Sequence, residues 1–497
     1  MRNNVKGRIK KVFLVFVWIV IALGIYQCGS NLPDHSTDLV EEPDDESQST
    51  EMDSGMKAPF DKMIRILIMT QDFKGIYHSE LKITCSDGMT VECDGEVSEY
   101  DPGSQYILNI QDLKTMKHIT ISGKNNGRLQ IENISRNSPA QYRGKLECYL
   151  EADGIVVVNE LPVEEYLYGV VPSEMPSSYP EEALKAQAIC ARTYTYFHKQ
   201  SYAYPQWQAN MDDSIAFQVY MNCAEDSRTC KAVDDTKDQI LAYKDAIVQS
   251  FYYSTSSGLN GGAGVWKDHL EAEDGYLKET GCEIYAANND EGEAAYKEYI
   301  DSGNPEDAEY EEAWYRWSYE KALDAVAVKC MMGRLYRMSL SQPQKVRIRS
   351  QYLPTEKIKE EDQIVDIRIL NRRKSGLVTA IMIETKQFRV SVMSQHTIRQ
   401  AFGCAGDIVI KKDGTSYVMG DTLPSAYFYI QKEYDNTGES GNNLNQIIIY
   451  GAGFGHGCGM SQNGAKCLAG RGLTAEEILT YYYNGDVESV GELTTDR

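Results

Sequence analysis

The sequence of 497 residues predicts an α+β fold, a β-rich composite body with one central helix that carries the candidate site, behind an N-terminal membrane anchor. Three observations support this prediction. Apolar and polar residues alternate over much of 63–158, which indicates strands. An alanine-dense stretch over 180–199 has the start and end signals of a helix. A basic stretch followed by an apolar run opens the chain and is typical of a signal anchor.

The composition excludes some function classes. The chain has 50 Lys and Arg against 73 Asp and Glu, a net charge of −23. This charge argues against a nucleic-acid binder, which needs basic patches to neutralise phosphates. It also argues against loose electrostatic adsorption to an anionic membrane or wall. The hydrophobic fraction of 42% is ordinary for a globular protein, and the length predicts about two to four domains.

We interpret residues 1–28 as a cytoplasmic tail and a single-pass anchor in the cell membrane. Basic residues precede an apolar run over 12–26. Positive charge stays on the cytoplasmic side, so we expect the body on the extracytoplasmic side. The apolar run is shorter than the roughly 20 residues of an ordinary spanning helix. A cleaved signal peptide and a lipoprotein modified at Cys28 therefore stay open as alternatives.

Residues 29–57 are crowded with Asp, Glu, Pro and Ser, and we expect a disordered acidic linker there. Eleven of the 12 cysteines follow the anchor, without the CxxC pairs of a zinc ribbon. Cys85 with Cys93, and Cys223 with Cys230, are close enough in sequence to be candidate disulfides.

The body divides near residue 158. Over 58–158, Ile64, Ile66 and Ile68 recur at every second position and glycine-containing turns separate the runs, so we expect a β-rich N-terminal part. Residues 159–490 form the expected core domain. Its clearest helix runs from Pro180 to about Lys199.

An acidic insertion rich in Tyr and Trp interrupts the core domain near 284–330 and ends in an expected helical stretch near 318–330. Patterns of strands return at 364–370 and 378–383. Short strands and a polar loop are expected over 403–443, and helices near 460–468 and 475–482 close the body.

Glu174 is the first candidate for chemistry. It lies between Pro172 and Pro176, which disfavour a helix or an inner strand, so we expect a stiff, partly apolar loop. A carboxyl group held there has the environment that raises a pKa toward that of a general acid at neutral pH. A helix cap or a solvated loop acid is the structural alternative.

Two cations on the 180–199 helix are also candidates. Lys185 and Arg192 are seven residues apart, hence on one helical face, where they would present positive charge to an anionic ligand. Gln187 and Tyr194 lie on a different, more core-like face. In the structural alternative, Lys185 is exposed to solvent and Arg192 pairs with a local acid.

Glycines alternate with other residues over 451–459, which favours a turn that brings His456 beside a cleft. No Gly-Lys-Ser/Thr follows, so this is not a phosphate loop. A lone histidine is more often structural than a ligand or a base. No second histidine stands at metal-ligand spacing.

Three stretches together resemble the family of stage II sporulation protein D, whose domain is shared with the LytB amidase enhancers. They are Glu-Tyr-Leu-Tyr-Gly-Val-Val-Pro-Ser-Glu-Met-Pro from Glu165, followed by the helix from Leu184; Gln218-Val-Tyr, then Ser254-Thr-Ser-Ser-Gly and Val265-Trp; and Gly-Phe-Gly-His-Gly-Cys-Gly-Met-Ser-Gln-Asn-Gly-Ala, then Tyr-Tyr-Tyr-Asn-Gly. The matches follow the family's order over roughly 60–490.

The resemblance implies a lytic transglycosylase that cuts peptidoglycan glycan strands stripped of stem peptides, with a partner amidase and other engulfment proteins, during forespore engulfment. Glu174 matches the catalytic glutamate and Arg192 an active-site arginine, which would pair with the lactyl carboxylate of muramic acid. The matched motifs predict a substrate-binding set: Arg192, Lys185, Gln187, Tyr194, Ser254, Ser256, His456, Gln462 and Tyr483.

No metal or cofactor is expected. Some clostridial relatives bind zinc through His and Cys just before the Gln-Val-Tyr segment, whereas 214–217 here contains neither. Two other function classes stay open. One is a non-catalytic relative that binds wall glycan and stimulates an amidase. The other is a tethered structural protein of the spore coat or envelope.

Overall fold

The computed structural model describes residues 62–111, 118–266, 275–350, 363–435 and 443–490. The expected anchor and acidic linker lie outside these residues. Within the described part, no helix is long and apolar enough to cross a membrane. The described residues form a mixed structure of helices and sheets, which confirms the α+β class.

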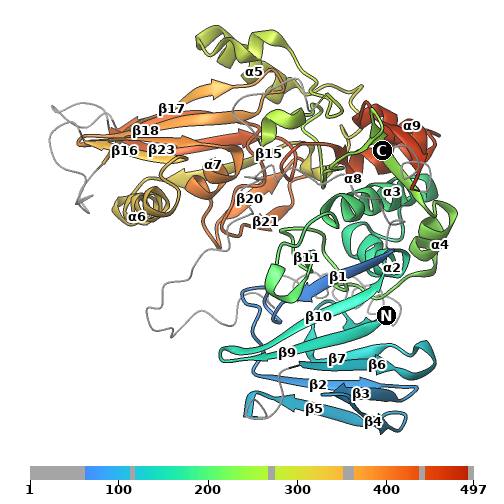
Figure 1. Cartoon of the computed structure of the whole chain (residues 1–497). Coiled ribbons are helices and arrows are strands. Elements are labelled where there is room, and N and C mark those ends of the chain that lie inside the picture. Colours follow the sequence, from blue (N-terminus) through green and yellow to red (C-terminus); the bar gives the residue numbers. More distant parts are fainter. Residues whose placement is uncertain (1–61, 112–117, 267–274, 351–362, 436–442, 491–497) are drawn as a thin grey trace, which may run out of the picture.

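The strands of the N-terminal part form two sheets that share a hydrophobic core (Figure 1). The larger sheet has the order β11-β1-β10-β9-β6-β3-β4, and the smaller has the order β5-β2-β7-β8. Alternate residues of β2 are buried, because the strand faces this core on one side only. The bounds are β1 Met63–Ile68, β2 Glu80–Cys85, β3 Met89–Cys93, β4 Glu96–Tyr100, β5 Gln105–Asn109, β6 His118–Gly123, β7 Leu129–Ser135, β8 Pro139–Tyr142, β9 Lys145–Glu151, β10 Gly154–Pro162 and β11 Met211–Asp212.

Three helices connect the N-terminal sheets to the rest of the body. These are α2 (Val163–Glu174), α3 (Glu181–His198) and α4 (Ser227–Asp235). The alanine-dense α3 contributes residues to two hydrophobic cores: Ala188 and Ala191 pack with the N-terminal sheets, and Ala186 and Ile189 pack with the C-terminal elements. Its small side chains allow close packing on both sides, so α3 lies between the two cores. The sequence predicts that this helix carries the candidate site, whereas Glu174 lies on α2.

The C-terminal elements build a five-stranded and a four-stranded sheet around a second core. One has the order β21-β20-β15-β23-β22, and the other has the order β16-β19-β18-β17. Helix α7 packs on β18 and β19, and α6 packs on β16. The bounds are β15 Trp317–Ala322, β16 Val346–Ser350, β17 Ile364–Arg372, β18 Val378–Thr385, β19 Phe388–Met393, β20 Ile408–Lys411, β21 Ser416–Val418, β22 Phe428–Asp435, β23 Asn443–Gly451, α5 Asp290–Ser302, α6 Ala325–Ser341 and α7 Gln395–Phe402.

The end of the chain returns to the central helices. Helices α8 (Gln462–Gly470) and α9 (Ala475–Tyr482) pack against α3, and Figure 1 shows them beside it. The short strand β24 (Met460–Ser461) pairs in parallel with β14 (Tyr252–Tyr253). The remaining elements are β12 Gln239–Tyr243, β13 Ala246–Ile247, β25 Asp486–Ser489, which pairs with β12, and the 3-10 helices η2 Lys124–Asn126, η3 Pro205–Trp207, η4 Gly262–Val265, η6 Glu283–Ala287 and η7 Ala313–Tyr315.

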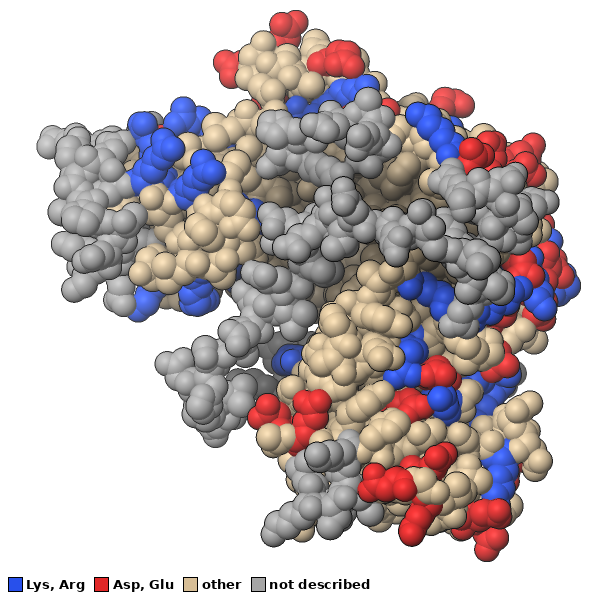
Figure 2. All heavy atoms as spheres, in the orientation of Figure 1, with Lys and Arg blue, Asp and Glu red and all other residues tan. Residues whose placement is uncertain are grey.

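Charge is unevenly distributed over the visible surface. Figure 2 shows Asp and Glu gathered around α5 and over the lower strands β3–β5, and Lys and Arg near β16–β18. Helix α5 belongs to the acidic insertion, so part of the net negative charge lies there.

Two sequence-based expectations are wrong. The stretch 318–330 is not one helix: β15 occupies its start and α6 begins at Ala325, because Trp317 and Tyr319 alternate inward as a strand between β20 and β23. The candidate disulfides are absent, since all cysteines in the described part are free. Cys85 ends β2 in one sheet, whereas Cys93 ends β3 in the other. Cys223 and Cys230 are likewise unbonded.

Candidate active site

Glu174 is the last residue of helix α2 rather than a loop residue, which corrects the expectation from its two prolines. Pro172 lies inside the last turn of the helix, where it removes one backbone donor and costs about 3 kcal/mol. The helix nevertheless buries an apolar face, at roughly 1.5–3 kcal/mol for each large side chain. That face consists of Val163, Tyr166, Leu167, Val170 and Val171. The free energy gained by burying these side chains therefore exceeds the cost of Pro172. The helix ends at Glu174, two residues before Pro176.

The Glu174 carboxyl group is held by three neighbours from distant parts of the chain. Its Oε1 accepts a hydrogen bond from the backbone N–H of Val219 at 2.7 Å. The Gln462 side-chain amide, on the first residue of α8, donates to the Glu174 carbonyl at 3.0 Å and lies 3.5 Å from Oε2. The Tyr252 hydroxyl is the third hydrogen-bonding neighbour. The carboxyl group is thus fixed in orientation.

The protonation of Glu174 follows from this environment. Burial raises the pKa of the carboxyl group to about 7, because a desolvated carboxylate loses hydration. The hydrogen bonds that Val219 and Gln462 donate, together with the contact to the Tyr252 hydroxyl, lower the pKa by less than burial raises it. At neutral pH both the acid and its conjugate base are therefore populated, which suits a group that donates and then accepts a proton.

Gln187 and Tyr252 extend the polar contacts around the acid. Gln187 is fully buried, its Oε1 lies 3.5 Å from the Gln462 amide nitrogen, and its own Nε2 has no partner in the described part of the chain. Tyr252 donates its hydroxyl to Gln218 Oε1 at 3.0 Å. The sequence-predicted Gln187 and Gln462 thus meet beside Glu174, although they are 275 residues apart.

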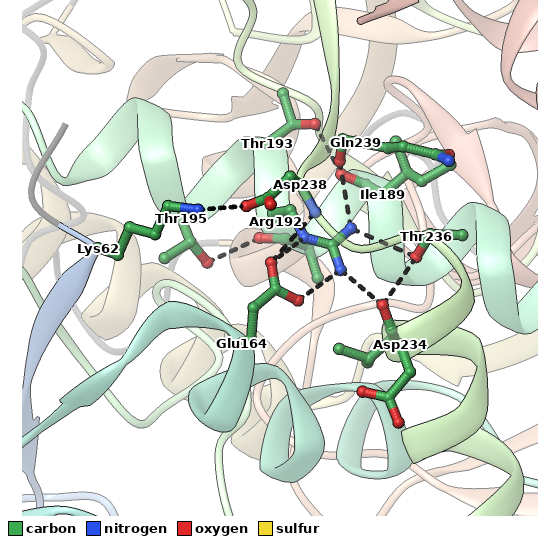
Figure 3. Close-up of polar contacts among 12 residues, drawn as sticks. Lys62, Glu164, Ile189, Arg192, Thr193, Thr195, Asp234, Thr236, Asp238 and Gln239 are labelled. Carbon is green, nitrogen blue, oxygen red and sulfur yellow. Dashed lines mark hydrogen bonds and ion pairs between the residues drawn. The ribbon is translucent and has the colours of Figure 1, made fainter. Parts of the chain in front are cut away.

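Arg192 is fully buried, and Figure 3 shows its polar contacts. Its guanidinium group forms a bidentate pair with Glu164 of α2, with both distances 2.8 Å. The remaining N–H groups donate to Thr236 Oγ1 and to the backbone carbonyls of Gln239 and Val233. With the side chain 0% exposed and all five donors used, Arg192 does not present its charge to a ligand in this structure. It joins α2, α3 and the end of α4, which is the structural alternative weighed for it.

Lys185 faces α4 as Arg192 does, as expected from their seven-residue spacing, but it lies at the surface. Its ammonium group contacts the carboxylates of Glu182 at 3.0 Å, Glu181 at 3.4 Å and Asp235 at 3.7 Å. The hydrogen bond to Glu182 is the main cause of its raised pKa. This cation is thus neutralised by local acids.

His456 is held in an aromatic cluster. Glycines 453, 455, 457 and 459 all adopt positive φ, which confirms the conformational role expected for them. The Nε2 of His456 donates to the Tyr252 carbonyl at 2.9 Å, and Nδ1 accepts from the Cys458 N–H at 3.1 Å. Burial lowers the pKa of His456 to about 3, so the ring stays neutral. Both nitrogens are occupied, and the ring fixes the backbone beside Tyr252.

The other predicted residues support the segments around the acid. Tyr483 is fully buried and its hydroxyl joins the Phe251 carbonyl to the Met460 N–H. The Ser254 carbonyl accepts from the Asn463 N–H at 2.9 Å. Tyr194 is buried and packs on His198. Ser256, also buried, donates its N–H to Glu309 at 2.7 Å.

Three functional candidates were not identified from the sequence. Val219 lies in the quoted Gln-Val-Tyr motif, but it acts through its backbone N–H, which carries no side-chain signal. Tyr252 lies two residues before the quoted Ser254. Glu309 lies in the acidic insertion, and nothing in its sequence distinguishes it from the exposed acids nearby.

Two family models match parts of this chain. The family described as Stage II sporulation protein matches residues 151–243, which contain Glu174, and a domain of unknown function (DUF8618) matches 272–459. Residues 151–243 therefore carry a match to the SpoIID domain, and the relatives named stage II sporulation protein D support the same family.

The relatives are distant. The chain is 25% identical over 343 residues to stage II sporulation protein D of Bacillus subtilis, covering 66% of this chain and 74% of that protein. It is 26% identical over 325 residues to the amidase enhancer of Bacillus subtilis, covering 64% of this chain but only 39% of that longer protein. An uncharacterized protein of Brachyspira hyodysenteriae is 26% identical over 352 residues, with 69% and 71% covered.

Proposed function

We propose that this protein is a lytic transglycosylase that cleaves peptidoglycan glycan strands, stripped of stem peptides, to 1,6-anhydro-muramic ends during sporulation. One observation carries the proposal: Glu174 is a fixed, partly buried carboxyl group whose pKa is raised to about 7. Family membership supports it by linking the chain to sporulation.

A single carboxyl group is sufficient for this reaction. In the first step, protonated Glu174 donates its proton to the glycosidic oxygen as the bond to the muramic anomeric carbon breaks. In the second, the Glu174 carboxylate takes the proton of the muramic C6 hydroxyl, whose oxygen bonds to the anomeric carbon of the same sugar. The leaving strand keeps the first proton, and the enzyme regains one. No water enters, and the intramolecular attack gains from proximity.

The neighbours of Glu174 fit these steps. Val219 and Gln462 hold the carboxyl group in one orientation, so that the atom that donates the proton also recovers it. Neutral His456 leaves the proton transfers to Glu174. We further propose that an N-terminal anchor keeps the body on the extracytoplasmic side of the membrane, next to a partner amidase.

A second candidate function is non-catalytic binding of wall glycan that stimulates an amidase. The observation that favours it is the relative named amidase enhancer. This alternative requires no proton transfer by Glu174 and therefore makes a different prediction for its substitution.

The decisive experiment digests purified denuded glycan strands with the full-length protein and its Glu174→Gln variant, followed by mass spectrometry. We expect anhydro-disaccharide ends from the wild type, and a loss on the order of 10²–10⁴-fold in the variant, because a general acid contributes that much. Glu165→Gln makes the same change in the first turn of the same helix and should keep wild-type activity.

The outcomes separate the two candidates. Glycan binding without anhydro ends from either protein, together with stimulation of an added amidase, would establish the binding function instead. Anhydro ends that persist in Glu174→Gln would show that another group supplies the proton.

A further inference from the structure

We propose that Glu309, from the acidic insertion, is a positioning residue that holds the start of α8 and thereby places Gln462 against Glu174. The inference rests on the proposed function and adds a residue that lies outside the stretch matched to the sporulation family and inside the domain of unknown function.

Glu309 is a buried acid with two donors on one oxygen. Glu309 is only 3% exposed. Its Oε1 accepts hydrogen bonds from the Ser461 hydroxyl at 2.5 Å and from the Ser256 backbone N–H at 2.7 Å. It forms no ion pair with any residue that the structure describes. Burial raises the pKa of this carboxyl group to about 7.

The approach of Glu309 depends on a glycine in α8. A Cβ added at Gly464 would lie 3.0 Å from Glu309 Oε2 and 1.9 Å from the Tyr482 hydroxyl. The absent side chain therefore leaves the space in which the carboxyl group meets the helix start. The insertion and α8 are fitted to each other at this point.

The contact continues directly to the candidate catalytic group. Ser461 is the N-cap of α8, and its Oγ also accepts the Gly464 N–H at 3.2 Å. The next residue, Gln462, donates to the Glu174 carbonyl and approaches its carboxyl group. Neighbouring Asn463 is tied to Thr255 Oγ1 at 2.8 Å and to the Tyr179 hydroxyl at 2.5 Å. The helix start is therefore the element through which Glu309 acts on Glu174.

A carboxyl group buried without a counter-ion is costly unless it is hydrogen-bonded. Both donors of Glu309 come from segments that frame the site: Ser256 follows β14, and Ser461 ends β24. The two strands already pair with each other, at Tyr252 with Met460 and Tyr253 with Ser461. Glu309 adds a second connection between them on the side of α8. Its task requires a hydrogen-bond acceptor rather than a charge.

The test compares kcat and KM of Glu309→Ala, Glu309→Gln, Gln462→Ala and the double variant Glu309→Ala/Gln462→Ala on denuded glycan. We expect Glu309→Ala to lower kcat by about 10- to 100-fold, as small displacements near reacting groups do, with KM nearly unchanged. Glu309→Gln keeps the acceptor oxygen and should stay within about threefold of wild type. The double variant should be no slower than Gln462→Ala, because both changes remove one effect.

Several results would overturn the proposal. If Glu309→Ala keeps the wild-type kcat, Glu309 has no positioning role. Equal loss in Glu309→Gln and Glu309→Ala would make Glu309 an acid or base itself. If the losses of kcat in the two single variants add up in the double variant, Glu309 does not act through Gln462. Glu306→Ala, an exposed acid in the same segment, is the matched control.

Crystal structures of the variants test the positioning role of Glu309 independently of the proposed reaction. If the wild type produces no anhydro ends, the proposed function fails, and structures of Glu309→Ala and Glu309→Gln decide the positioning role. Displacement of the Gln462 amide from Glu174 only in the alanine variant supports it, and an unmoved amide overturns it. If Glu309→Ala does not fold, Ser461→Ala removes the contact with Glu309 together with the N-cap bond to Gly464, and the Gln462 amide should be displaced from Glu174 in its crystal structure.

Discussion

Glu174 and Arg192 are charged residues on adjacent helices, and the protein treats them in opposite ways. Arg192 has all five donors satisfied and a carboxylate, Glu164, in bidentate contact. Glu174 has hydrogen bonds but no ion pair with any described residue, and burial raises its pKa to about 7. Arg192 is fully hydrogen-bonded, whereas Glu174 is populated in both its protonated and its ionised form near neutral pH.

The partners of the two side chains separate a charge that joins elements of the fold from an acid that is able to exchange a proton. A buried charge that is fully paired gives up its freedom to bind or exchange protons and serves to join elements. A buried acid without a counter-ion stays poised for proton transfer near neutral pH. Sequence motifs identify both residues, but only their partners distinguish the two roles.

Removal of the Arg192 guanidinium group should destabilise the protein strongly. Arg192→Ala leaves Glu164 without its partner and should lower the free energy of unfolding by about 3–5 kcal/mol, measured by urea denaturation. Lys185→Ala on the same helix removes a partly exposed cation and should cost about 0–1 kcal/mol. If Arg192 instead contacts the lactyl carboxylate of muramic acid, its loss would weaken glycan affinity without this difference in stability.

The pH dependence of kcat/KM tests the protonation state of Glu174. The first step needs protonated Glu174, so activity should fall as pH rises through about 7. His456 cannot produce this limb, because its pKa is lowered to about 3. The pKa of Glu309 is also raised to about 7, so Glu309→Gln is the control and should keep the limb. If the midpoint of the fall in kcat/KM lies near pH 4.5 instead, the pKa of Glu174 is not raised.

The smallest expected effect is on stability. The folded-state pKa of Glu174 lies above its unfolded value of 4.5, so between these values the folded state binds more protons. Stability from this group therefore falls as pH rises from about 4.5 to 7. The difference in Tm between Glu174→Gln and wild type should grow over this interval and be constant above it. A difference that does not change with pH would mean that Glu174 titrates alike in both states.

Local patterns predicted much of the fold. The alternation at Ile64, Ile66 and Ile68 became β1, and the alanine-dense stretch became α3. A final helix was expected near 475–482, and α9 runs over Ala475–Tyr482, where Thr474 caps its start. Expectations failed where packing competes with local preference. Pro172 is tolerated inside α2 because the helix buries an apolar face. The start of 318–330 forms a strand because it pairs with β23.

The same division applies to the candidate site. Glu174, Gln187 and Gln462 were chosen from their motifs, and the structure brings them together. The partners of Arg192 and His456 could not be chosen in this way. Glu164 is one of several acids near the helix, and the nearest partners of His456 are backbone atoms. Hydrogen-bond partners of this kind have no sequence periodicity.

The sequence by itself determined the α+β class, the positions of the strongly patterned elements, the glycine turn and the family, because each depends on residues that are neighbours in the chain. Only the tertiary structure decided that α2 carries Glu174 at its end, that Arg192 faces inward, and that Glu309 reaches the start of α8. These facts depend on desolvation and on contacts between segments that are 28 residues apart for Arg192 with Glu164, 152 for Ser461 with Glu309 and 288 for Gln462 with Glu174. Such contacts form only when the chain folds, and they set which charged groups remain reactive.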